Sequence, residues 1–349
     1  MCGIVGVLSQ HQAAPILVES LKRLEYRGYD SAGIATVNNG NLERRRAVGK
    51  LVNLSDLLVH KPLAGKSGIG HTRWATHGVP STKNAHPHQA GSVAVVHNGI
   101  IENFKTLRED LVRLGYNYET DTDTETVALL AQHYLSQGDT PRVAAKKTVD
   151  QLGGAFALAF LFDGEDDLMI VARRGSPLAI GHGKREMYIG SDAIALAPLT
   201  DQITYMDEGD FAVLTRNSLE ITDINGDLVN REIRKISINA TQVDKSGYKH
   251  FMAKEIAEQP SILKHTLQNY VNADGTDIKL PTSGVDLTKI ERLTIVACGT
   301  AFYAALTAKY WFEKIARIPV EVDVASEFRY REPPVAEGTS AIFVSQSGE

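Results

Sequence analysis

The opening stretch MCGIVGVL constrains this chain more than any other. The apolar run at residues 4–8 predicts a short buried strand, and such a strand would fix a terminus that otherwise frays. Gly3 and Gly6 would allow other backbone segments to come close. Cys2 directly precedes this strand. Any fold that buries the strand must therefore hold a thiol at a defined place beside a sheet.

Cys2 can carry both a nucleophile and a base. Residue 2 is small, so removal of the initiator methionine would leave Cys2 with a free α-amino group. The unperturbed pKa of a thiol is about 8.5 and that of an α-amine about 8, so the amine can take the thiol proton directly or through one water. We interpret Cys2 as a candidate nucleophile for acyl transfer, activated by its own amine. The alternative is an ordinary strand that begins near a cysteine.

Composition limits the class of protein. The 349 residues suffice for about two domains, and a hydrophobic fraction of 43% with 23% charged residues is typical of a soluble globular chain. The net charge of −5 gives no reason to expect a nucleic-acid partner. The two cysteines, Cys2 and Cys298, form no disulfide framework. No apolar run approaches the ~20 residues that span a bilayer, and no basic leader precedes the apolar start, so we expect a cytoplasmic protein without membrane contact.

The stretch from residue 68 to residue 99 is rich in polar motifs. Residues 68–74 predict a strand that runs into HTRWATHG (71–78); HPH (86–88) follows, and then a predicted strand at 93–96 leads into HNG (97–99). Five histidines here raise the question of a metal. Their spacing places no pair on one helix face, and no cysteine or carboxylate completes a ligand set, so we expect no metal.

Two loops allow more than one interpretation. The motif at 97–99 is either an Asn-Gly turn or an oxyanion hole in which the Asn98 amide and the Gly99 N–H point at one place. The segment YRGYDSAG (26–33) is interpreted as a polar turn before a strand at 34–37. Asp123, in TDTE (122–125), is either a plain helix N-cap or a binding residue.

The rest of the first 235 residues alternates between helical and strand patterns. We expect helices at 15–24, 103–114, 124–136 and 141–152, and strands at 155–162, 168–172, 178–180, 187–189, 203–205, 211–214 and 219–221. Strand-dense sequence with a few grouped helices favours an α+β fold of two packed sheets covered by helices.

A polar linker at 236–250 separates this part from a second pattern. A helix with Pro260 as an interruption is expected at 251–267. Buried strands at 293–297, 320–324 and 341–344 alternate with a helix at 301–315, which predicts a parallel α/β sheet. Loops rich in hydroxyl groups and glycine follow the first and third of these strands, where phosphorylated ligands bind in such sheets. Only three strands follow residue 290, so we expect an incomplete domain.

These motifs together identify a family. MCGIVG, EYRGYDSAG, HTRWATHG, HPH, HNG and TDTE resemble, in order, the glutaminase domain of class II glutamine amidotransferases, which are N-terminal nucleophile hydrolases. ACGT, ASEFRYRE and SQSGE resemble the first part of a sugar isomerase (SIS) domain. The resemblance implies a four-layer αββα glutaminase domain at residues 2–240, a linker with interdomain helices at 241–290, and a truncated SIS-type domain at 291–349.

The resemblance also assigns roles by motif. Cys2 is implied as the nucleophile, and Asn98 and Gly99 as the oxyanion donors. The implied glutamine ligands are Arg73 for the α-carboxylate and Asp123 for the α-ammonium group, with Thr76 and His77 beside them and Trp74 as the gate of the ammonia passage. The implied sugar-phosphate ligands are Thr300, Ser345, Gln346 and Ser347.

The implied function is hydrolysis of L-glutamine to glutamate and ammonia. In the full-length family the ammonia goes to fructose 6-phosphate and gives glucosamine 6-phosphate, no cofactor is needed, and the enzymes are homo-oligomeric, so a dimer is expected. This chain alone is expected to retain only the glutaminase activity. Two alternatives stay open: an enzyme similar to phosphoribosyl pyrophosphate amidotransferase, and a non-catalytic sugar-phosphate sensor.

Overall fold

The computed structural model describes residues 2–75, 78–236, 247–272, 275–278 and 286–345. The chain divides into two compact units, Met1–Tyr248 and Lys249–Glu349. Among the described residues, no helix is both long enough and apolar enough to cross a membrane.

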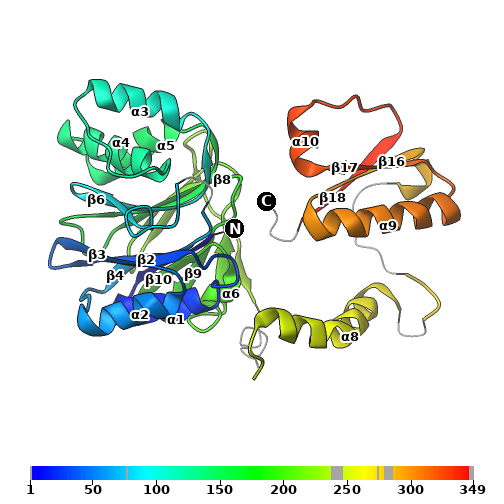
Figure 1. Ribbon diagram of the computed structural model, residues 1–349, viewed down its shortest axis with the longest axis horizontal. Helices are drawn as coiled ribbons and strands as arrows, with labels where there is room; N and C mark the ends of the chain where they lie inside the picture. The colour runs from blue at the N-terminus through cyan, green and yellow to red at the C-terminus, as the bar shows by residue number, and fades with distance from the viewer. Residues whose placement is uncertain (1, 76–77, 237–246, 273–274, 279–285, 346–349) are drawn as a thin grey trace. The chain divides into compact units, whose positions relative to one another are not determined.

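The first unit contains two antiparallel sheets stacked face to face (Figure 1). One sheet orders its strands, within the described residues, as β15 (Ile233–Lys235), β11 (Gln202–Tyr205), β9 (Ala179–Gly183), β10 (Glu186–Gly190), β1 (Gly3–Leu8), β4 (Ser67–Arg73), β2 (Ser31–Asn38) and β3 (Asn41–Val48). The other orders them as β14 (Leu228–Val229), β13 (Leu219–Thr222), β12 (Phe211–Leu214), β8 (Met169–Arg174), β7 (Gly154–Phe162), β6 (Val93–Ile101) and β5 (His88–Ala90).

Helices cover the outer face of each sheet (Figure 1). Against the sheet that contains β1 lie α1 (Ala13–Lys22), α2 (Leu51–His60) and the short α6 (Ala193–Leu196). On the side of the sheet that contains β6 lie α3 (Phe104–Arg113), α4 (Thr124–Ser136) and α5 (Pro141–Gln151). The expected αββα arrangement is confirmed.

Three apolar layers hold these elements together. The layer between the sheets includes Ile4, Ile69 and Val96, all completely buried. The other two layers fill the spaces between each sheet and its helices. Both β1 and β4 are buried along their whole length, because each has the second sheet on one face and helix α1 on the other. Position 2 is therefore anchored to one of the most buried strands in the unit.

Several elements differ from the sequence prediction. The strand expected at 93–96 continues to Ile101, because residues 93–101 pair in register with β7. The 97–99 motif is thus part of a strand, and the Asn-Gly turn interpretation is wrong. Similarly, β2 already begins at Ser31, inside the segment that we expected to be a turn. The sequence analysis also missed β3 and α2, whose polar residues interrupt a simple periodicity.

The second unit contains a three-stranded parallel sheet in the order β17 (Val320–Val324), β16 (Arg292–Ala297), β18 (Thr339–Val344). Helix α9 (Gly299–Ile315) packs on this sheet, and α10 (Ala325–Tyr330), which the sequence analysis did not predict, follows β17. Helix α8 (Phe251–Tyr270) runs through Pro260 without the expected interruption, and a short 3-10 turn, η1, covers Leu287–Lys289.

Candidate active site

Cys2 lies where β1 starts, beside the end of β4. The two strands are antiparallel with Gly3 opposite Thr72, which brings Cys2 next to Arg73. The Trp74 N–H donates a hydrogen bond to the Cys2 sulfur over 3.2 Å, and the thiol lies 3.5 Å from the Trp74 carbonyl oxygen. The side chain is half-buried. The backbone that follows β4 therefore fixes the position of the sulfur.

Burial raises the pKa of the Cys2 thiol above its ordinary value. The hydrogen bond from Trp74 and the positive charge of Arg73 lower it, whereas the Asp30 carboxylate raises it. The balance favours the neutral thiol. A base is therefore needed to form the thiolate, as the interpretation of Cys2 requires.

Asn98 reaches Cys2 from the other sheet. Its amide nitrogen Nδ2 donates to the backbone oxygen of Cys2 over 3.1 Å, and its oxygen Oδ1 lies 3.0 Å from Nε2 of His71. The next residue, Gly99, has a φ of 114°, and a Cβ there would lie 2.1 Å from the Ala155 carbonyl oxygen. Only glycine fits at this place in β6. The amide of Asn98 is thus held against the residue that carries the thiol.

Arg73 ends β4 and is buried. It donates to the Gly78 carbonyl oxygen over 3.1 Å, and its Nη1 lies 4.0 Å from Oδ1 of Asp30. Asp30 also accepts a hydrogen bond from the Ala75 N–H. One carboxylate therefore holds both the arginine and the first part of the segment after it.

Trp74 extends outward from this place, with 48% of its surface exposed. Its ring meets the ring of Tyr29 edge to face, with 5.6 Å between centroids. A Cβ on Gly28 would lie 2.6 Å from the Arg73 carbonyl carbon, so the 26–30 segment lies directly against the end of β4. The sequence analysis interpreted that segment as a turn and used it as a family motif, but it missed the contact with β4; the two glycines and Asp30 were the available signal.

Asp123 precedes helix α4 and is buried. It stands at the N-cap position but makes no side-chain capping bond. Its Oδ2 instead accepts from the Ile101 N–H over 2.9 Å, at the end of β6. The plain N-cap interpretation is therefore wrong, and this bond fixes Asp123 to the strand that carries Asn98.

Four of the five motif histidines are described, and all four are buried. The rings of His71 and His86 stack with centroids 4.1 Å apart, and His88 meets His86 edge to face. His97 and His88 bond the hydroxyl groups of Thr124 and Thr122. Burial lowers the pKa of His71 to about 3 and the pKa values of His86 and His88 well below their ordinary value. In the described part of the chain, no group of three potential ligands could hold a metal ion. Thr76 and His77 lie outside the described residues.

The second unit places two of its four candidate residues at one edge of its sheet. Strands β16 and β18 are parallel neighbours with Ala297 opposite Val344. Thr300 lies in the first turn of α9 just beyond β16, and the exposed Ser345 directly follows β18. Both therefore lie at the carboxyl edge, where sheets of this type bind phosphorylated ligands. Gln346 and Ser347 lie outside the described residues.

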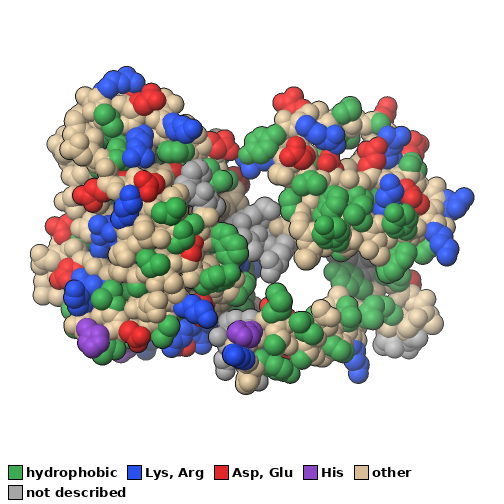
Figure 2. Space-filling view, in the orientation of Figure 1, with side chains coloured by type: hydrophobic (Ala, Val, Ile, Leu, Met, Phe, Trp, Pro, Cys, Tyr) green, Lys and Arg blue, Asp and Glu red, His purple; other side chains and the backbone are tan. Residues whose placement is uncertain are grey.

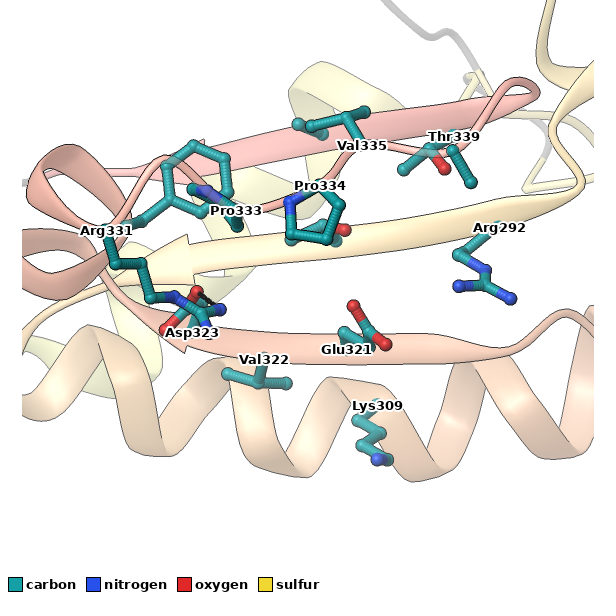
Figure 3. A pocket seen from close by; sticks show the side chains of 14 residues that line it. Arg292, Lys309, Glu321, Val322, Asp323, Arg331, Pro333, Pro334, Val335 and Thr339 are labelled. Atoms are coloured by element: carbon teal, nitrogen blue, oxygen red, sulfur yellow. Dashed lines mark hydrogen bonds and ion pairs between the residues drawn. The ribbon is translucent and has the colours of Figure 1, made fainter.

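A cavity of about 650 Å³ also lies in this unit, but neither Thr300 nor Ser345 lines it. Figure 3 shows lining side chains from the three strands, from α9 and from the segment at 331–336. Arg331 and Asp323 form an ion pair at one end of the lining residues. The cavity is therefore separate from the candidate sugar-phosphate residues.

In the comparison with known proteins, a different family model matches each of the two units. A model of the glutamine amidotransferase domain matches residues 71–198, and a model of the SIS domain matches residues 286–349. Proteins named glutamine–fructose-6-phosphate aminotransferase (isomerizing) are similar along the whole chain. The one from Brucella suis is 56% identical over 349 residues, and one from Bradyrhizobium diazoefficiens is 58% identical over 350. The chain covers 58% of the length of each.

Two solved structures share the fold. A structure described as the allosteric regulatory enzyme of purine biosynthesis is 26% identical, with a TM-score of 0.56 over 64% of this chain and 49% of its own. Glutamine phosphoribosylpyrophosphate amidotransferase from B. subtilis has a TM-score of 0.58 over 92% of this chain and 65% of its own; at 20% identity it supports the fold alone. The first unit therefore has the fold of the N-terminal nucleophile glutamine amidotransferases.

Proposed function

Because this chain joins a glutamine amidotransferase domain to a SIS domain, we propose that it hydrolyses L-glutamine at Cys2. The whole protein passes the ammonia to fructose 6-phosphate and forms glucosamine 6-phosphate. One observation carries the proposal: Cys2 is held by two residues at once. Its sulfur accepts a hydrogen bond from the Trp74 N–H over 3.2 Å, and its backbone oxygen accepts one from the Asn98 amide nitrogen over 3.1 Å. A nucleophile and an oxyanion donor are thus held together by two different sheets.

The reaction begins with the free α-amine of Cys2, once Met1 has been removed. The amine takes the thiol proton, and the thiolate attacks the side-chain amide carbon of glutamine. The Asn98 amide and the Gly99 N–H stabilise the negative oxygen that forms. The α-ammonium group returns its proton to the leaving nitrogen, and ammonia departs to leave a thioester. Water, deprotonated by the same amine, then cleaves the thioester to glutamate and the thiol.

Glutamine is a zwitterion, so its binding site needs one fixed positive and one fixed negative group. We assign Arg73 to the α-carboxylate and Asp123 to the α-ammonium group, and the assignment is supported by the backbone hydrogen bonds that hold each charged side chain in place. We also assign glutamine binding to Thr76 and His77, which lie outside the described residues, and gating of the ammonia passage to Trp74. In the second unit, Thr300, Ser345, Gln346 and Ser347 bind the sugar phosphate.

The domain division at 2–240, 241–290 and 291–349 remains a proposal, since the compact units meet at Tyr248 inside the middle segment. We also place the protein in the cytoplasm as a homodimer, on the basis of the family resemblance. The SIS match favours a sugar phosphate over phosphoribosyl pyrophosphate as the acceptor of ammonia.

The decisive experiment compares the two cysteines. Cys2→Ala should abolish glutamate release from L-glutamine, whereas Cys298→Ala, which changes an exposed cysteine in the second unit, should leave the rate unchanged. Intact mass must show that Met1 is absent from the active protein, and circular dichroism must show that both variants fold. A Cys2→Ala variant that releases glutamate at the wild-type rate contradicts the proposal. A wild-type chain that binds sugar phosphate but never releases glutamate would favour the sensor alternative.

A further inference from the structure

His71 is a buried side chain that the proposed mechanism does not use. It lies in β4, and its ring nitrogen Nε2 meets two oxygens at 3.0 Å each: the backbone oxygen of His97 and Oδ1 of Asn98. The ring is completely buried. A backbone carbonyl oxygen can only accept a hydrogen bond, so Nε2 of His71 must carry a proton.

This proton decides which way the Asn98 amide points. Because Nε2 of His71 donates, the atom of Asn98 that faces it must be the oxygen. The nitrogen Nδ2 then faces the Cys2 carbonyl oxygen at 3.1 Å, where only a donor can bond. If the amide were reversed, its N–H group would face the N–H of His71, and its oxygen would face the carbonyl oxygen of Cys2. Two backbone carbonyl groups, one on each side, therefore impose the same orientation.

The ring also stays neutral. Burial lowers the pKa of His71 to about 3, although its bonds to Asn98 and His97 favour the charged form. At neutral pH the imidazole thus has a single N–H group, and the bond to the His97 carbonyl oxygen fixes it on Nε2. The opposite nitrogen has no hydrogen-bond partner within the described residues, and the ring stacks on His86.

We propose that His71 is a positioning residue that keeps the N–H side of the Asn98 amide turned toward Cys2. This inference rests on the proposed function of Cys2 and Asn98. Oxyanion stabilisation requires a donor that already points at the developing charge. An amide free to turn over would present its oxygen for part of the time, which repels the oxyanion instead of stabilising it. His71 acts through Asn98 and touches no reacting atom.

Two variants of similar length separate the N–H group from the bulk of the ring. His71→Gln can place an amide N–H near the position of Nε2, whereas His71→Met fills the same space without a donor. We expect His71→Met to lower kcat on the order of tenfold, the effect of losing one hydrogen bond of average strength, with little change in KM. His71→Gln should retain most of kcat. Equal kcat values for the two variants would overturn the inference.

A double-mutant cycle with Asn98→Ala tests whether the effect passes through Asn98. If it does, His71→Met lowers kcat in the wild-type background and adds nothing once Asn98 is alanine. If the fold-losses in kcat from the two substitutions multiply in the double variant, His71 acts independently of Asn98, and the inference is overturned. His88→Gln is the control for disturbing the histidine cluster, because His88 bonds Thr122 and not Asn98. It should leave kcat close to the wild-type value.

One measurement needs neither catalysis nor a stable variant at position 71. In the full chain labelled with 15N-histidine, the side-chain spectrum should show His71 protonated at Nε2 and bare at Nδ1, and its signals should shift in Asn98→Ala. A proton on Nδ1 would overturn the inference even in an active enzyme. If the wild-type chain shows no Cys2-dependent hydrolysis, the proposed function fails, while this spectrum still decides the orientation of the amide.

Discussion

Strands β1 and β18 have similar sequences and different surroundings. Both contain a short apolar run, IVGVL in β1 and AIFV in β18, and both form strands. Every residue of β1 is buried, whereas Phe343 in β18 is 64% exposed. The difference lies in what covers them, since β1 has a second sheet on one face and a helix on the other. An apolar run therefore specifies a strand, but the neighbouring layers decide how much of it is buried.

The same contrast holds for the two units as a whole. Among the described residues, the first unit contains three large apolar clusters, and the second contains one small cluster around Leu293 and Ile295. Large side chains such as Tyr310 and Trp311 of α9 are exposed in the second unit, and Figure 2 shows hydrophobic side chains gathered over that helix. The candidate glutaminase residues lie in the well-packed unit, where their positions are determined by many contacts at once.

The largest contrast should come from one substitution made in each unit. Gly99→Ala places a Cβ 2.1 Å from the Ala155 carbonyl oxygen in β6, so we expect a loss of stability above about 4 kcal/mol. A Cβ on Gly299 would meet nothing within 4 Å. Gly299→Ala should therefore lower the free energy of unfolding by only about 1–2 kcal/mol, because alanine disfavours the left-handed φ of 59°. Urea unfolding followed by circular dichroism measures both. Equal losses would mean that the two units are equally constrained.

Asn98→Ala should lower kcat for glutamine hydrolysis about 10²–10³-fold, which corresponds to roughly 3–4 kcal/mol. KM should change much less, because the oxyanion forms only after attack. Steady-state kinetics on glutamate release test this. An effect on KM alone would indicate that Asn98 only shapes the pocket.

Acidification should affect the first unit more than the second. The pKa values of His71, His86 and His88 are lowered by burial, so the folded unit binds fewer protons than the unfolded chain below pH 6.5. The contribution of these histidines to the free energy of unfolding is therefore fully present above pH 6.5, and it is lost as the pH falls below that value. We expect a loss of roughly 1 kcal/mol per histidine at about pH 5.5. Hydrogen exchange, corrected for intrinsic rates, should show weaker protection in residues 2–236 and little change in residues 292–344; equal loss in both would contradict the role of these histidines.

The smallest effect is expected from the second unit. Ser345→Ala changes an exposed hydroxyl beyond β18, in a different unit from Cys2. Glutamate release should stay within about twofold of wild type, because the oxyanion donors and the nucleophile are untouched. Binding of fructose 6-phosphate, measured by calorimetry on the full-length protein, should weaken. A large loss of glutaminase activity would show that the two sites are coupled.

Local sequence patterns were enough to predict most of the helices and strands. Helix α4 and strands β12 and β17 have the expected bounds, because hydrophobic periodicity and turn residues are local signals. The motifs also placed Cys2 and Asn98 among the expected site residues before any geometry was known. The two packed sheets followed from the density of strands.

The contacts between the site residues come from the packing of whole sheets. Asn98 lies in a strand because β7 pairs with it along its length, and no signal within residues 93–101 could reveal that pairing. Asp123 accepts from the Ile101 N–H at the end of β6 instead of capping its own helix, a contact between elements that the motif at 122–125 does not encode. His71 meets Asn98 only because two sheets stack face to face. Contacts between residues distant in sequence depend on the packing of whole layers, which local patterns do not encode.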